Sequence, residues 1–110
     1  MKPTLMGAFA AALAAGFTAQ APAQDARSLA ATCFTCHGTD GRSVGGVPPS
    51  LAGRPKSELL QAMKDFKEGK RPATIMHQHA KGYSDQELDL ITGYFAGVKP
   101  GAAAPAPAAR

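Results

Sequence analysis

The chain has no tryptophan and only two cysteines among its 110 residues. Its aromatic side chains are five phenylalanines and two tyrosines, and its net charge of +4 comes from basic residues spread along the chain. A nucleic-acid-binding protein would combine a dense basic stripe with stacking aromatics, so this composition argues against that class. A disulfide between Cys33 and Cys36 would close too small a loop to stabilise a domain, which points to a bound cofactor instead.

The one long apolar run lies at the N-terminus. Lys2 precedes an alanine-rich stretch over residues 5–19, and Ala21-Pro22-Ala23 follows as a small-x-small cleavage pattern. This order is typical of a secretory signal peptide. We therefore predict a signal peptide at 1–23, cleaved near Ala23, and a periplasmic mature protein. The run is too short for a comfortable membrane span, so we expect no stable membrane insertion after cleavage; an uncleaved N-terminal anchor is the alternative.

Beyond residue 23 the apolar residues recur at helical spacing and never alternate as along a strand, which predicts an all-α domain over 24–98. The expected elements are a helix over 24–36, a helix that Ser57 caps and Gly69 ends, a short turn that Thr74 caps, and a last helix opened by a Ser84–Glu87 capping box. Residues 39–55 are rich in glycine and proline, so we expect a long loop that wraps something. The Ala/Pro segment 99–110 is predicted to be disordered.

The chemistry of the chain is concentrated in Cys33-Phe34-Thr35-Cys36-His37. This is C-x-x-C-H, the attachment signal for c-type haem. Thiols three residues apart on a helix lie on one side, where both can add to the vinyl groups of one porphyrin, and His37 then offers an imidazole to the iron. The other ring nitrogen of such a histidine usually donates to a carbonyl, which we expect in the Pro48-Pro49 loop.

Two other sites use closely spaced cysteines. A thioredoxin-type dithiol opens a helix after a strand, whereas these cysteines close a helix in a sequence without strand signals. A structural zinc site needs four ligands, and two cysteines with one histidine supply three. One covalent haem c is therefore the predicted cofactor, and no arrangement for hydrolytic catalysis accompanies it.

The second axial ligand must come from later in the chain. Met63 lies at helical spacing with apolar neighbours and is expected to fill the core. Met76 lies in a proline-bounded segment that can fold over the far face of the haem, so we predict Met76 as the ligand. His77 and His79 are the alternatives. Thioether ligation raises the potential and suits an electron carrier. Haem propionates need donors, and the candidates are Arg54, Arg71, Tyr83 and backbone amides of the loop.

Several longer runs carry a family resemblance. The chain from about residue 29 to 95 resembles class I cytochromes c, and more narrowly the monohaem cytochrome subunit of flavocytochrome c sulfide dehydrogenase. The runs that suggest this are CFTCHGTDG at 33–41, SVGG at 43–46, SLAG at 50–53, FKEGKRPATIM at 66–76 and AKGYSD at 80–85. The chain departs from that family in two respects: members often carry two haem domains, and Gly-Arg usually follows the ligand methionine where His77-Gln78 stand here.

The resemblance implies a class I cytochrome c fold, with three to five helices around one covalent haem and the first and last helices crossing. It also implies Met76 as the sixth ligand and an FAD-containing partner subunit that oxidises sulfide. The chain would not be an enzyme alone; it would take electrons from the flavin and pass them to a downstream acceptor. The alternative is a free-standing soluble cytochrome that shuttles electrons between respiratory or photosynthetic complexes.

Overall fold

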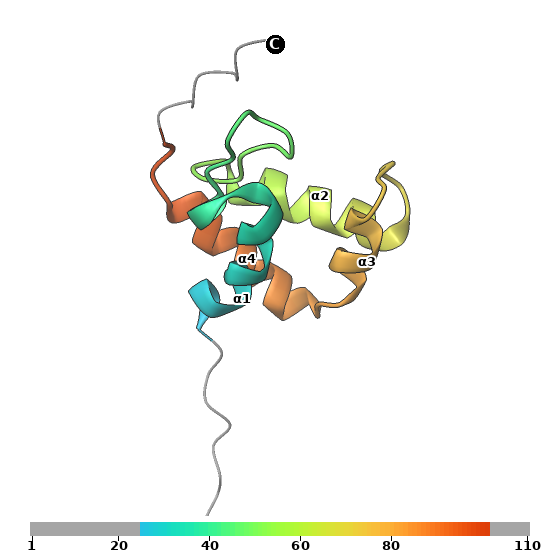
Figure 1. The fold of residues 1–110 in the computed structure, drawn as a ribbon. Helices are drawn as coiled ribbons and strands as arrows, with labels where there is room; N and C mark the ends of the chain where they lie inside the picture. The colour runs from blue at the N-terminus through green and yellow to red at the C-terminus, as the bar shows by residue number, and fades with distance from the viewer. Residues whose placement is uncertain (1–24, 102–110) are drawn as a thin grey trace, which may run out of the picture.

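The computed structural model describes residues 25–101, which form four α-helices and one short 3-10 turn (Figure 1). In chain order these are α1 (Ala26–His37), the 3-10 turn η1 (Thr39–Gly41), α2 (Lys56–Glu68), α3 (Met76–Lys81) and α4 (Asp85–Gly97). Residues 25–101 contain no strand, so the all-α prediction is confirmed. Within the same range no helix is long and apolar enough to cross a membrane. The predicted signal peptide and most of the predicted tail lie outside the described residues.

The first and last helices cross, as the resemblance implied, and their contact holds the core (Figure 1). Ala30 on α1 is fully buried, and its small side chain allows the two helices to approach closely. Ile91 and Phe95 face it from α4, and Leu59 of α2 completes the buried cluster. Phe34 packs its ring edge-to-face on Phe95, with centroids 6.2 Å apart, an arrangement that aromatic pairs prefer.

Helix α1 occupies almost the predicted range. Its N-cap is Asp25, whose carboxylate accepts the backbone N–H of Ser28 at 3.3 Å. It ends at Gly38, which has φ +83° and returns its own N–H to the carbonyl of Phe34. Only glycine adopts that backbone conformation without strain. The helix therefore stops directly after the C-x-x-C-H motif.

Two of the three predicted caps are wrong. Ser57 lies inside the first turn of α2, because Pro55 occupies the N-cap position and its carbonyl accepts from the N–H groups of Glu58 and Leu59. Thr74 does not cap α3, whose N-cap is Ile75 and has no side-chain hydrogen bond. The third is confirmed: at α4 the Ser84 hydroxyl and the Glu87 carboxylate bond each other's backbone N–H, as a capping box requires.

The loop predicted over 39–55 begins instead with the 3-10 turn η1, and its remaining residues, 42–55, form neither helix nor strand. Three backbone hydrogen bonds hold it. The carbonyl of Gly41 accepts from Leu51 N at 2.8 Å and Ala52 N at 3.2 Å, and Gly53 N donates to the carbonyl of Phe95 at 2.8 Å. Both ends of the loop are therefore held against the α1–α4 crossing. The loop segment between them is positioned over the end of α1.

Candidate haem-binding site

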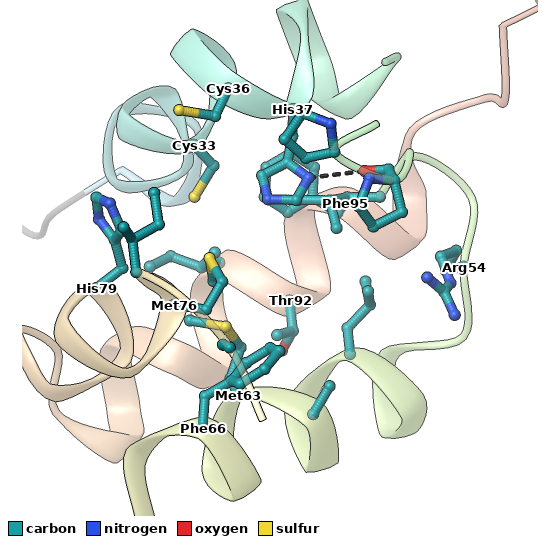
Figure 2. Close-up of a pocket in the computed structure, with 18 of the residues that line it drawn as sticks. Cys33, Cys36, His37, Arg54, Met63, Phe66, Met76, His79, Thr92 and Phe95 are labelled. Carbon is teal, nitrogen blue, oxygen red and sulfur yellow. Dashed lines mark hydrogen bonds between the residues drawn. The ribbon is translucent and has the colours of Figure 1, made fainter. Parts of the chain in front are cut away.

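A cavity of about 380 Å³ lies between the four helices and the 42–55 loop (Figure 2). Most of its lining is apolar, as expected for a site that binds a large flat ligand. Every helix and the loop contribute to it. Its side chains that can ligate a metal, carry a charge or attach a cofactor include Cys33, Cys36, His37, Arg54, Glu58, Met63, Arg71, Met76, His79 and Tyr83. The predicted attachment cysteines and the predicted ligands His37 and Met76 therefore line one cavity.

The last turn of α1 supplies the two thiols and the imidazole. Cys33 is half-buried and Cys36 is exposed, and neither forms a disulfide. Burial raises the pKa of the Cys33 thiol above its ordinary value; the hydrogen bond with Thr32 opposes this and the charge of Cys36 adds to it.

His37 is the buried polar residue of this turn, with an exposed fraction of 8 %. Its Nδ1 lies 2.7 Å from the carbonyl oxygen of Pro49, so the predicted carbonyl in the Pro48-Pro49 loop is present. A carbonyl can only accept, so Nδ1 carries a proton, and in the neutral ring Nε2 then keeps its lone pair. The hydrogen bond thereby fixes the tautomer and the ring orientation that a metal-binding histidine needs.

The two alternative uses of the cysteines each need further structural parts, which the described residues do not supply. Among the described residues, no group of three or more His, Cys, Asp or Glu side chains is placed to hold a metal ion by itself. Residues 25–101 contain no strand with which the motif could form the βαβ setting of a thioredoxin-type dithiol. The cysteines and His37 face a cavity large enough for an organic group instead.

Two methionines line the cavity from the helices that lie across from α1. Met76 begins α3, and Met63 comes from the middle of α2 (Figure 2). Met63 was expected in the core, but it is only half-buried and lies outside the buried cluster. Leu59, Met63 and Phe66 lie at i, i+4 and i+7 on one face of α2, and all three line the cavity. Only Leu59 also belongs to the buried cluster formed with α4.

The two histidines that follow Met76 have different surroundings. His77 Nε2 donates to the carbonyl of Arg71 at 2.6 Å, and its ring packs edge-to-face on Phe66. His77 is therefore engaged outside the cavity lining. His79, one turn after Met76, lines the cavity and is exposed to solvent.

All three side chains predicted as propionate donors line the cavity, and each already has a partner. The Tyr83 hydroxyl donates to Thr32 Oγ1 at 2.6 Å, because the Thr32 hydroxyl itself donates to the carbonyl of Leu29. Arg54 forms an ion pair with Glu58, one turn further along the chain. The guanidinium of Arg71 lies over the Phe66 ring, 5.1 Å from its centroid.

The lining residues that sequence reasoning did not single out include Glu58 and Thr92. Glu58, in the first turn of α2, places a carboxylate beside Arg54 at the cavity. Thr92 is almost fully buried and donates its hydroxyl to the carbonyl of Leu88 at 2.7 Å. The signal for Thr92 was available, since it follows Leu88 by four residues on the buried face of α4.

The donor set fits a covalently attached haem. Two thiols three residues apart, an imidazole with a free Nε2, and two thioethers converge on one apolar cavity, and this combination defines a c-type haem protein. A cytochrome c family model matches residues 23–99. The chain belongs to the cytochrome c family, as an electron-transfer cytochrome of class I, and its cofactor is covalently bound haem c.

Two relatives and one solved structure show which members of that family the chain resembles. The cytochrome subunit of sulfide dehydrogenase from Chlorobaculum tepidum is 46% identical over 67 residues, covering 61% of this chain and 60% of the relative. Cytochrome c4 from Pseudomonas aeruginosa is 42% identical over 73 residues, covering 66% of this chain and 36% of the relative. The structure of cytochrome c4 from Acidithiobacillus ferrooxidans superposes with a TM-score of 0.56 at 33% identity, covering 60% of this chain and 38% of that one.

The covered shares of these proteins limit which of their properties can be inferred for this chain. The chain spans about three fifths of the sulfide dehydrogenase subunit and little more than a third of cytochrome c4. The similarity therefore establishes the haem-binding domain and its fold. The two kinds of relative differ in their names, so the partner of this chain is a separate question.

Proposed function

We propose that this chain is a periplasmic one-electron carrier whose haem c is bonded through Cys33 and Cys36, with the iron held between His37 and Met76. The observation that carries the proposal is the Nδ1–H bond from His37 to the Pro49 carbonyl. In the neutral ring it leaves Nε2 available to a metal, and His37 lines the same cavity as both thiols and Met76. When bound, haem c supplies a one-electron couple between ferric and ferrous iron.

The protein's own residues have separate tasks in this proposal. Cys33 and Cys36 retain the cofactor by two thioether bonds. The Pro49 carbonyl makes the His37 imidazole more electron-rich and holds its orientation, which favours ferric iron. Met76 opposes this, because a thioether ligand favours ferrous iron and raises the potential. The apolar lining from Ile91, Phe95 and their neighbours excludes water, which disfavours the added charge of the ferric state.

These ligand assignments have a direct spectroscopic test. A ferric cytochrome with methionine ligation shows a weak charge-transfer band at the red end of the visible spectrum. We expect this band in the holoprotein, its retention in Met63→Leu and in His79→Gln, and its loss when Met63→Leu and Met76→Leu are combined. Loss of the band in the His79 variant, or in Met63→Leu alone, would contradict the assignment.

We further propose that the electron donor is an FAD-containing subunit that oxidises sulfide, so the chain is not an enzyme alone. The support is the relative named as the cytochrome subunit of sulfide dehydrogenase and the two runs at 66–76 and 80–85 that resemble that subfamily. Co-purification would reveal flavin and haem in one complex, and sulfide should then reduce the ferric haem. A cytochrome that purifies alone, and stays ferric when sulfide and the flavoprotein are supplied, would refute the partnership.

The second candidate is a free-standing carrier that passes electrons between larger complexes. It is favoured by the similarity to cytochrome c4, which reaches 42% identity in sequence and includes a solved structure. The same experiment separates the two functions. A free-standing carrier would purify without flavin, be reduced by several donors, and show no saturable complex with the sulfide-oxidising flavoprotein.

A further inference from the structure

The cavity holds two thioethers, although the proposed function uses only one. Met76 enters from the start of α3 and Met63 from the middle of α2, and both line the cavity (Figure 2). In the same view Cys33, Cys36 and His37 come from α1 across the cavity. Both methionines therefore lie among the side chains that line the space opposite the imidazole.

The two methionines are anchored to different degrees. Helix α3 has six residues and its N-cap, Ile75, makes no side-chain hydrogen bond. Ile75 is itself half-exposed, with an exposed fraction of 52 %. Short segments with few buried anchors are the ones that open locally. The buried residue of α3 is Ala80, near the opposite end of the helix from Met76, so Met76 lies at the end of α3 that is anchored less.

Met63 belongs to α2, which is longer and better anchored than α3. Helix α2 has 13 residues, buries Leu59 against α4, and ends at Gly69, whose N–H reaches back to Phe66. Opening of α3 breaks its contact with α2, where His77 packs on Phe66, but Leu59 still holds α2 in the buried cluster with Ile91 and Phe95 of α4. A methionine side chain has three rotatable bonds and a soft sulfur, so it can adapt its reach to a neighbouring space.

We propose that Met63 is a reserve axial ligand, which binds the haem iron when Met76 leaves it. This inference rests on the proposed function, in which Met76 is the resident ligand. The exchange breaks one thioether–iron bond and forms another, with no electron transferred and no proton released. Because the donor atom is the same, the protein retains the same type of iron coordination while α3 is open.

His79 is the rival for this role. It lines the cavity one turn after Met76, but it belongs to the same short helix and moves with it. His77 is a weaker rival, since its Nε2 is engaged by the Arg71 carbonyl and it lies outside the lining. The alternatives differ in the spectrum that they produce, which makes the test decisive.

The experiment compares ferric holoproteins of the wild type, Met76→Ala, Met63→Leu and the double variant. Leucine at 63 conserves volume and removes only the sulfur. We expect the methionine charge-transfer band in the first three proteins and its absence in the double variant. A spectrum of two imidazole ligands, or of bound water, in Met76→Ala would overturn the proposal. Retention of the band in Met76→Ala with its loss in Met63→Leu would instead overturn the assignment of Met76 itself.

A second measurement covers the case in which Met76→Ala folds poorly. Both Met76→Ala and the double variant are assembled with imidazole as an external ligand, and the affinity for imidazole is then titrated. If Met63 occupies the iron half of the time, the apparent dissociation constant of Met76→Ala should be about twofold larger than that of the double variant. Equal affinities would show that Met63 does not compete, and the proposal would fail while the proposed function survives.

Discussion

Gly41 offers a test of how the 42–55 loop is held against the helices. Its φ is +77°, and a Cβ built there would lie 2.7 Å from Cδ1 of Phe95 and 3.1 Å from the backbone nitrogen of Ala52. The Gly41 carbonyl also accepts the two hydrogen bonds that close the loop. We therefore expect Gly41→Ala to strain the backbone and to force the best-buried aromatic ring of the core to shift.

The cost can be divided into two parts. An L-residue at left-handed φ costs roughly 1–2 kcal/mol. Overpacking against a ring and a backbone atom adds typically about 1–3 kcal/mol. The free energy of unfolding should therefore fall by about 2–5 kcal/mol, out of the ~5–15 kcal/mol that is usual for a domain. Part of the strain is offset because alanine also stiffens the unfolded chain.

Gly46→Ala is the matched control. Gly46 has nearly the same φ of +74°, but a Cβ there meets no atom within 4 Å. The backbone strain and the effect on the unfolded chain are common to both variants, so their difference isolates the overpacking, about 1–3 kcal/mol. Guanidinium unfolding of the ferric holoproteins, followed by far-ultraviolet circular dichroism, gives both values. Equal losses of stability in the two variants would show that the close packing of Gly41 on Phe95 carries no energy.

Two further predictions concern the proximal loop and the pH dependence of stability. The hydroxyl of Ser50 accepts the backbone N–H of Ser43 from across the loop at 2.9 Å. Ser50→Ala should therefore loosen the Pro49 carbonyl and weaken its hydrogen bond to His37, which raises the midpoint potential. Voltammetry measures this potential, and an unchanged value would contradict the prediction. The hydrogen bond to Asp40 raises the pKa of Tyr94 above its ordinary value. This bond therefore stabilises the fold fully below the ordinary tyrosine pKa of about 10. Its contribution is lost as the pH rises through the higher pKa of the folded state. Stability measured from pH 8 to 11 should therefore fall less steeply in Tyr94→Phe, and parallel curves for the two proteins would refute the linkage.

Much of the fold could be predicted because its signals are local. The C-x-x-C-H run needs only consecutive residues on one helix, and the capping box needs only Ser84 and Glu87 three positions apart. The carbonyl that accepts from His37 was also within reach. A glycine- and proline-rich loop that wraps a cofactor must present its carbonyls inward somewhere, and the Pro48-Pro49 pair marked the place.

The errors have two physical origins, and the first is competition between backbone groups that a sequence pattern does not rank. Serine is a favoured N-cap, but the carbonyl of Pro55 accepts the N–H groups of Glu58 and Leu59, so α2 begins ahead of Ser57. Met63 was assigned to the core because apolar spacing does not distinguish a buried face from a cavity wall. That distinction depends on where α3 lies, which is set by tertiary packing.

The two sides of the cavity differ in how they are built, and this difference explains why the far side was harder to predict. On the near side, His37 ends a capped helix and bonds a carbonyl in a loop that Gly41 and Gly53 fasten at both ends. On the far side, Met76 begins a short helix without a cap side chain, tied to the preceding loop by the bond from His77 to the Arg71 carbonyl. Perturbations of α3 should therefore change the methionine side first, and a second thioether on the firmer α2 lies where such a change can be absorbed.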